Sequence, residues 1–155
     1  MIFDLGLGDI FSVRIAGNIT SRKVLASVEY GCAVAGAKLL LVLGHTRCGA
    51  VTAAVELIGE PRTPAEITGC QHLEHIVSDI QRSTDVEACR AAALLTADQK
   101  LAFVDGVARR NVLRVVGEMQ KASRTLNDLV SGNSIAIVGA MYNVGTGEIE
   151  FFTDV

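Results

Sequence analysis

The chain has 155 residues, which is enough for one domain with a hydrophobic core and too few for two ordinary domains. Its formal net charge is −3 at pH 7, so the sequence offers no electrostatic basis for binding nucleic acid. Half of the residues are hydrophobic and the mean hydropathy is +0.38, which indicates an apolar surface covered by a partner subunit.

The same sequence argues against a membrane or secreted protein. No apolar stretch reaches the ~20 residues that a spanning helix needs, so we expect no membrane insertion. The first residues lack the basic region and long apolar block of a secretory signal. The cysteines form no CxxC pair and, without a secretory signal, indicate free thiols in a reducing compartment. We therefore expect a cytoplasmic protein whose four cysteines are Cys32, Cys48, Cys70 and Cys89.

The first part of the chain alternates between predicted strands and helices. Residues 9–14 resemble a short strand, and residues 16–18 a turn, because glycine and asparagine tolerate positive φ. Apolar residues recur at helical spacing from about 23 to 35. A continuous apolar run over 38–43 is typical of a strand buried on both faces of a parallel sheet. Small apolar residues over 48–58 predict a helix packed closely against that sheet.

The second part predicts mainly helices, followed by two strands. One helix is expected over 65–81, a longer helical region over 84–116 with a break near Thr96, and a short helix over 123–130. A buried strand over 134–140 and an antiparallel edge strand over 148–152 follow. This order predicts an α/β fold, three-layer and Rossmann-like, with a mostly parallel sheet and an antiparallel edge strand.

The most informative segment is Gly44–Gly49, which follows the apolar run directly. It places the His45 imidazole and the Cys48 thiol three residues apart. Residues at i and i+3 lie on one face of a helical turn, so both side chains can reach one ion. Neutral imidazole and thiolate are zinc ligands, so the pair is a plausible half of a zinc site. The alternative is a core cysteine beside a histidine that caps a turn.

Four short blocks of sequence occur along the chain in a fixed order: Arg14–Asn18, Ser27–Tyr30, Gly44–Ala50 and Gly139–Gly147. Together they resemble the β-class carbonic anhydrases, zinc enzymes that interconvert carbon dioxide and bicarbonate, over nearly the whole chain. The amino-acid sequence of these blocks is also similar to that of β-class domains attached to membrane anion transporters.

The resemblance implies that His45 and Cys48 are two protein ligands of a zinc ion. It implies reversible hydration of carbon dioxide to bicarbonate through a zinc-bound hydroxide. Because family members are dimers or larger assemblies, it also implies a homodimer or a higher homo-oligomer.

The family's third ligand is a cysteine in a Cys-x-Asp-Ser-Arg segment of the first central strand, whose Asp and Arg form a dyad at the metal. No Cys-x-Asp-x-Arg occurs in this chain. We therefore expect a single domain over residues 1–155, truncated at its N-terminus relative to the family and lacking the first central strand. Only half of the zinc site is then present, zinc is weakly bound or absent, and this chain by itself is inactive. The two flanking strands could close up, a second subunit could fill the gap, or the complete product could be longer.

Other residues could join the pair as ligands, although each has a simpler interpretation. Cys32, Cys70 and Cys89 are expected to be packing residues. His72 and His75 are expected to be an exposed pair on one helix.

Two functions therefore stay open. One is a β-class carbonic anhydrase. The alternative is a non-catalytic carbonic-anhydrase-related module for oligomerisation or anion binding, including one that accompanies an anion transporter. A Rossmann-like nucleotide binder is excluded, because no G-x-G-x-x-G follows a predicted strand.

Overall fold

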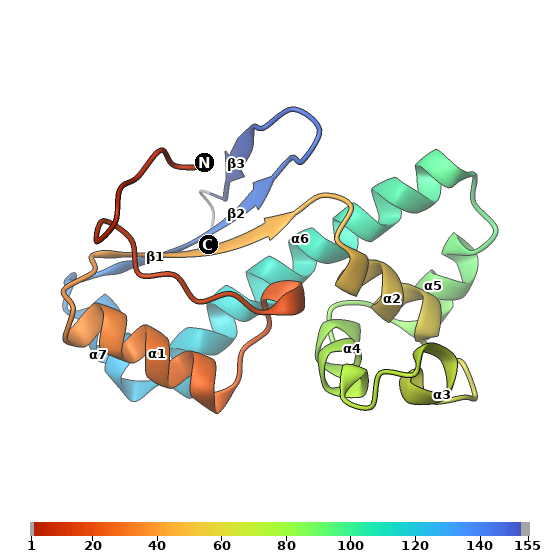
Figure 1. Ribbon diagram of the computed structural model, residues 1–155, viewed down its shortest axis with the longest axis horizontal. Coiled ribbons are helices and arrows are strands. Elements are labelled where there is room, and N and C mark those ends of the chain that lie inside the picture. Colours follow the sequence, from red (N-terminus) through yellow and green to blue (C-terminus); the bar gives the residue numbers. More distant parts are fainter. Residues whose placement is uncertain (1, 153–155) are drawn as a thin grey trace.

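The computed structural model describes residues 2–152 and is shown in Figure 1. Its strands are β1 (Leu39–His45), β2 (Ala136–Tyr142) and β3 (Ile149–Phe151). Its helices are the 3-10 turn η1 (Ala16–Asn18), α1 (Arg22–Ala33), α2 (Gly49–Leu57), α3 (Pro64–Thr68), α4 (Leu73–Gln81), α5 (Val86–Ala92), α6 (Ala97–Ala122) and α7 (Arg124–Ser131).

The strands form one small mixed sheet in the order β1-β2-β3. β1 and β2 are parallel, with a register that runs from Leu39 opposite Ala136 to His45 opposite Tyr142. β3 pairs with β2 in the antiparallel sense. α6 packs against both β1 and β2, while α1 and α7 lie at one end of it and α2 to α5 at the other (Figure 1). The predicted α/β class and antiparallel edge strand are confirmed.

Side-chain caps explain where several helices begin. Ser21 accepts a hydrogen bond from the Val24 N–H at the start of α1. Thr96 and Gln99 form a reciprocal capping box, which starts α6 and accounts for the predicted break in the helical region near Thr96. α6 is long but carries many charged residues, and none of the helices within residues 2–152 is both long and apolar enough to cross a membrane.

Two glycines allow α6 to approach the β1–β2 pair closely. A Cβ on Gly44 of β1 would lie 2.6 Å from Val112 Cγ2, and one on Gly139 of β2 would lie 2.9 Å from Val112 Cγ1. Val112 is fully buried in the hydrophobic core. Each of its methyl groups therefore occupies space that a side chain on the neighbouring strand would need.

The predicted strand over 9–14 is wrong, because this segment has no regular secondary structure and pairs with no strand of the described chain. Asp9 accepts a hydrogen bond from the Gly6 N–H, which makes it a turn residue. Phe11 lies over Gly31 and against Tyr30 of α1. Strand pairing requires a partner at hydrogen-bonding distance, and the contacts of this segment with α1 supply none.

The prediction that residues 38–43 are buried on both faces of the sheet is also wrong. Of these residues only Val42 is buried, whereas Leu40, Leu41 and Leu43 are half-buried and Leu39 is 55% exposed. Within residues 2–152, β1 pairs only with β2, so its other edge is also open. An uncharged open edge of this kind is available to another strand.

The single helix predicted over 65–81 is divided into α3 and α4. Gly69 ends α3 in the left-handed conformation (φ 76°), and Pro64 begins it. His72 is the N-cap of α4 and His75 lies in its first turn, so they do not occupy one continuous helical face as expected. The cause is Gly69, whose left-handed conformation ends α3 before His72 is reached.

β3 is attached to α6 by a two-pronged ion pair. Both terminal nitrogens of Arg109 donate to Glu150 oxygens at 2.6 Å, and the guanidinium lies 4.3 Å from the centre of the Phe152 ring. The hydrogen bonds from Arg109 hold the pKa of the Glu150 carboxyl below its usual range. The carboxylate therefore contributes stability above the pKa it has in the unfolded chain, and this contribution is lost as pH falls through its lowered pKa.

We expect Gly44→Ala to lower the free energy of unfolding by about 1–3 kcal/mol, because its Cβ has no room beside Val112 and Met141. Gly117→Ala is the matched control on α6. A Cβ there meets no atom within 4 Å, so helix propensity should stabilise the chain by about 0.5–1 kcal/mol. Urea denaturation of both variants measures the contrast, and equal effects of the two substitutions would contradict the close approach.

We expect Glu150→Gln to destabilise the chain at neutral pH and to have little effect in acid, where the native carboxyl is itself protonated. Denaturation curves of the two proteins across this pH range measure the difference. Glu74→Gln serves as the control, since Glu74 is an exposed carboxylate for which no ion pair is found among the described residues. A difference for Glu150→Gln that stays constant down to low pH would contradict the ion pair.

Candidate metal site

The candidate site is the connection from β1 to α2. His45 is the last residue of β1, and Cys48 is the N-cap of α2. His45 is exposed and Cys48 is buried, with 6% of its surface accessible. The His45 Nδ1 lies 2.9 Å from the Thr46 carbonyl oxygen. In the tautomer that donates to this carbonyl, the Nε2 keeps its lone pair and is the nitrogen available to a metal.

Three hydrogen bonds hold the backbone of this connection. The Thr46 N–H donates to the Tyr142 carbonyl at 3.0 Å, which continues the β1–β2 pairing by one residue. The Thr46 hydroxyl accepts from the Val144 N–H at 3.1 Å. The Arg47 N–H donates to Asp105 Oδ1 of α6 at 2.7 Å. The turn between the two candidate ligands is therefore attached to both β2 and α6.

Arg47 adopts a left-handed conformation with φ 55°, which is uncommon for a residue with a side chain. The short bond to Asp105 offsets the cost of this conformation. Arg47 is exposed to solvent. Asp105 was not singled out from the sequence, because a carboxylate in a charged helix has no pattern that marks its partner.

A second turn, η1, lies against this connection. η1 contacts β1, α2, α4 and α6. Gly17 is buried with φ 70°, and a Cβ built on it would lie 2.4 Å from Ile80 Cδ1 and 3.7 Å from the Ala50 Cβ. The turn predicted over 16–18 is confirmed, and it packs on the first turn of α2, two residues beyond Cys48. The Asn18 Nδ2 is buried and finds no acceptor among the described residues.

The other candidate ligands lie apart from this connection. Cys32 and Cys89 are buried in the core as predicted, and burial raises the pKa of the Cys32 thiol. The prediction that Cys70 is a packing residue is wrong, because Cys70 is exposed in the link between α3 and α4. His72 and His75 are exposed as expected. Within residues 2–152, no three His, Cys, Asp or Glu side chains gather as a metal site would require.

The donor chemistry of the pair nevertheless fits zinc. His45 offers an imidazole nitrogen at the end of β1, and Cys48 offers a thiol at the start of α2. Histidine nitrogen and cysteine sulfur are both common zinc ligands. Two ligands are fewer than the three that a catalytic zinc site takes from protein. His45 and Cys48 therefore form a part of a site rather than a complete one.

The fold and this connection together define a β-class carbonic anhydrase architecture, and sequence comparison gives the same class. The sequence model described as carbonic anhydrase matches residues 1–149. The chain therefore belongs to the β-class carbonic anhydrase family.

Particular relatives agree with this assignment. Carbonic anhydrase 2 of Mycobacterium tuberculosis is 35% identical over 147 residues, which cover 95% of this chain and 64% of that protein. The carbonic anhydrase of Mycolicibacterium smegmatis is 33% identical over 150 residues, which cover 97% and 66%. The chain thus spans about two-thirds of the length of these relatives.

Solved structures show the same fold at lower identity. One of the tetrameric β-carbonic anhydrases of Sordaria macrospora matches with a TM-score of 0.77 at 19% identity, covering 98% of this chain and 72% of that one. A β-carbonic anhydrase of Aspergillus fumigatus matches with a TM-score of 0.78 at 20% identity, covering 99% and 68%.

We expect Asp105→Ala to accelerate hydrogen exchange of the Arg47 amide, because its acceptor is lost. Asp105→Asn keeps an oxygen acceptor at the same place and should largely preserve protection, which makes it the matched control. Residue-resolved exchange by NMR measures both variants. Equal exchange of this amide in the parent and in Asp105→Ala would show that α6 does not hold the turn.

Proposed function

We propose that this chain is part of a β-class carbonic anhydrase that catalyses the reversible hydration of carbon dioxide to bicarbonate. The observation that carries the proposal is the placement of His45 and Cys48 at the end of β1 and the start of α2 in a chain of this family. The relatives that match this chain over nearly its whole length are named as carbonic anhydrases, which supports the proposal.

We propose zinc as the cofactor, with His45 Nε2 and Cys48 Sγ as two of its protein ligands. A zinc ion at such a site lowers the pKa of a water molecule to about 7 and so supplies a nucleophile at neutral pH. The hydrogen bond from Nδ1 to the Thr46 carbonyl orients the imidazole. The bonds from Thr46 and Arg47 keep the two ligand-bearing residues at a constant separation.

The further ligand, and the acid and arginine that act beside it, would come from outside residues 2–152. The open edge of β1 supports this proposal, since a strand added there would run next to His45. The buried Asn18 Nδ2 supports it as well, because such a donor costs about 1–3 kcal/mol unless a group accepts from it. Residues 1–155 would then be a single domain that is incomplete without that strand.

We also propose a homodimer or a higher homo-oligomer in the cytoplasm. Exposed apolar side chains support self-association, and those of the N-terminal segment are Ile2, Leu5, Leu7, Ile10, Phe11, Val13 and Ile15. The related Sordaria macrospora enzymes are described as tetrameric. Four free thiols are compatible with a reducing compartment.

A second candidate function is a non-catalytic module for oligomerisation or anion binding, including one that accompanies an anion transporter. It is favoured by the finding that no three metal-binding side chains gather within residues 2–152. In this case the scaffold persists without a complete zinc site.

Zinc affinity and carbon dioxide hydration distinguish the two functions. We expect the purified chain to bind zinc weakly, and we expect Cys48→Ala to lower its zinc affinity at least about tenfold, because even the loss of a residue that only orients a ligand typically costs about 10- to 100-fold in metal affinity. Cys70→Ala is the matched control, because that thiol is exposed and remote from the connection. Calorimetric titration with zinc measures the affinity of the parent and of both variants.

Stopped-flow hydration of carbon dioxide then tests catalysis. We expect the 155-residue chain alone to be inactive, and a version extended by an N-terminal strand containing Cys-x-Asp-Ser-Arg to gain hydration activity that Cys48→Ala abolishes. An extended protein that binds one zinc per chain but hydrates carbon dioxide no faster than buffer would overturn the enzymatic proposal and favour the module.

A further inference from the structure

Asn111 is the only fully buried polar side chain of α6 among the described residues, and none of its surface is accessible to solvent. It lies in the apolar stripe of the helix, next to Val112. A buried amide is costly unless its donors and acceptor are paired. The partners of Asn111 therefore indicate why a polar residue is present at a core position.

Both ends of the Asn111 side chain are bonded, and they face different parts of the fold. Its Oδ1 accepts from Arg114 Nη2 at 2.8 Å and from the Ser83 hydroxyl at 3.1 Å. Its Nδ2 donates to the Gly17 carbonyl of η1 at 2.8 Å, across 94 residues of sequence. One side chain thus joins α6, the segment after α4 and the η1 turn.

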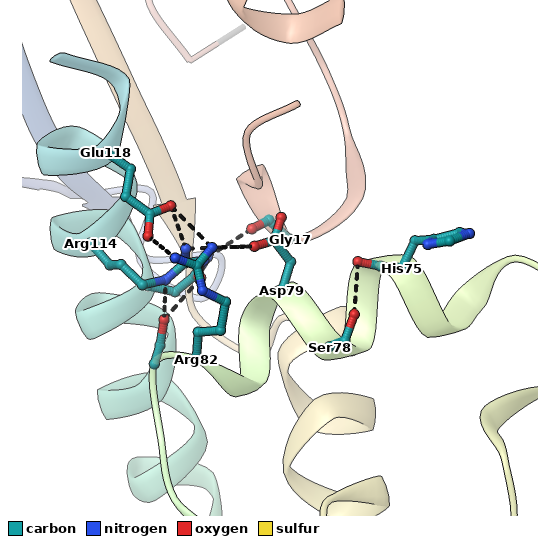
Figure 2. Close-up of polar contacts among 9 residues, drawn as sticks. Gly17, His75, Ser78, Asp79, Arg82, Arg114 and Glu118 are labelled. Atoms are coloured by element: carbon teal, nitrogen blue, oxygen red, sulfur yellow. Dashed lines mark hydrogen bonds and ion pairs between the residues drawn. The ribbon is translucent and has the colours of Figure 1, made fainter. Parts of the chain in front are cut away.

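The orientation of the amide follows from the charges around it. The Arg114 guanidinium also bonds Ser83 and Glu118, and it lies 3.6 Å from Asp79. Figure 2 shows this cluster between α4 and α6, with Arg82 bonded to the same two carboxylates and the His75 ring directed away from it. Since arginine only donates, the Asn111 oxygen must face Arg114 and the amide nitrogen must face Gly17.

The hydrogen bond to Gly17 is connected to Cys48 through the contact between η1 and α2. Gly17 fits between Ile80 of α4 and Ala50 of α2, where a Cβ on it would lie 2.4 Å from Ile80 Cδ1. Ala50 is in the first turn of α2, and the N-cap of that turn is Cys48. A displacement of η1 would therefore remove the support on which the Cys48-bearing turn rests.

We propose that Asn111 is a positioning residue for the metal-binding connection. It holds η1 against the first turn of α2 and thereby limits the movement of Cys48. The proposal rests on the proposed function for the importance of Cys48, but the mechanical link from Asn111 through Gly17 to Cys48 does not depend on zinc or on catalysis.

Cysteine alkylation provides the test, because the chain contains its own controls. Cys48, Cys32 and Cys89 are buried to nearly the same degree, with 6%, 7% and 5% of their surface exposed. The rate at which each thiol reacts with iodoacetamide in the folded, metal-free 155-residue chain is followed by peptide mass spectrometry. Global unfolding exposes all three thiols, whereas local release of the α2 turn exposes Cys48 alone.

The informative variant is Asn111→Asp, which keeps an oxygen acceptor for Arg114 and Ser83 and replaces the donor to Gly17 with a second oxygen, while the added negative charge lies beside the Arg114 guanidinium. We expect the alkylation rate of Cys48 to rise about three- to tenfold relative to Cys32 and Cys89, as the loss of one buried hydrogen bond implies. Gly17→Ala displaces the same turn from the other side and should give the same selective increase. Ser83→Ala is the control, since it removes a hydrogen bond to the Asn111 oxygen and leaves the bond from Asn111 Nδ2 to the Gly17 carbonyl in place.

Two results would overturn the proposal. In the first, Asn111→Asp raises the rates of all three buried thiols equally, which would make Asn111 a general stabilising residue. In the second, the Cys48 rate is unchanged in both Asn111→Asp and Gly17→Ala. If a version extended by an N-terminal strand containing Cys-x-Asp-Ser-Arg failed to bind zinc, the proposed metal site would be refuted, whereas a selective increase in the 155-residue chain would leave the mechanical link in place.

Discussion

Val112 of α6 packs against two glycines of the sheet, Gly44 and Gly139, and the arrangement of the candidate site depends on this contact. One of its methyl groups lies against Gly44 and the other against Gly139, so α6 straddles the parallel strands β1 and β2. Helix packing at this distance is possible only where a strand presents glycine. It fixes α6 relative to the last residues of β1, where the candidate ligands begin.

Two other residues of α6 then hold the backbone around the candidate ligands through hydrogen bonds. Asp105 holds the Arg47 N–H between the two candidate ligands, and Asn111 holds the Gly17 carbonyl behind the first turn of α2. These two residues lie nearly two helical turns apart and approach the connection from different directions. The geometry of His45 and Cys48 therefore depends on α6 as well as on their own local sequence.

Local patterns in the sequence were sufficient to predict much of this structure. Apolar periodicity predicted α1 and most of α6, small apolar residues predicted α2, and the continuous apolar run predicted β1. The Gly44–Gly49 motif located the candidate ligands, because strand, turn and helix start are all encoded within a few residues. The antiparallel pairing of β3 with β2 was also predicted, since a short turn joins the two strands.

The failures concern properties that depend on distant residues. Residues 9–14 have the composition of a strand, but pairing requires a neighbour that the described chain does not place beside them. Cys70 was expected in the core by residue type alone, and the helix break at Gly69 leaves it exposed. Asn111 was overlooked, although a polar residue inside an apolar helical stripe was a signal that could have been read. Its partner Gly17 is too far along the chain to be inferred from spacing.

The central claim is that one imidazole nitrogen and one thiolate sulfur bind the same zinc ion. X-ray absorption spectroscopy at the zinc edge of the zinc-loaded protein tests this most directly. The account predicts one sulfur neighbour at about 2.3 Å, together with a nitrogen at about 2.0 Å that shows the outer-shell scattering of a histidine ring. A zinc environment of oxygen neighbours alone, unchanged when Cys48 is replaced by alanine, would contradict it.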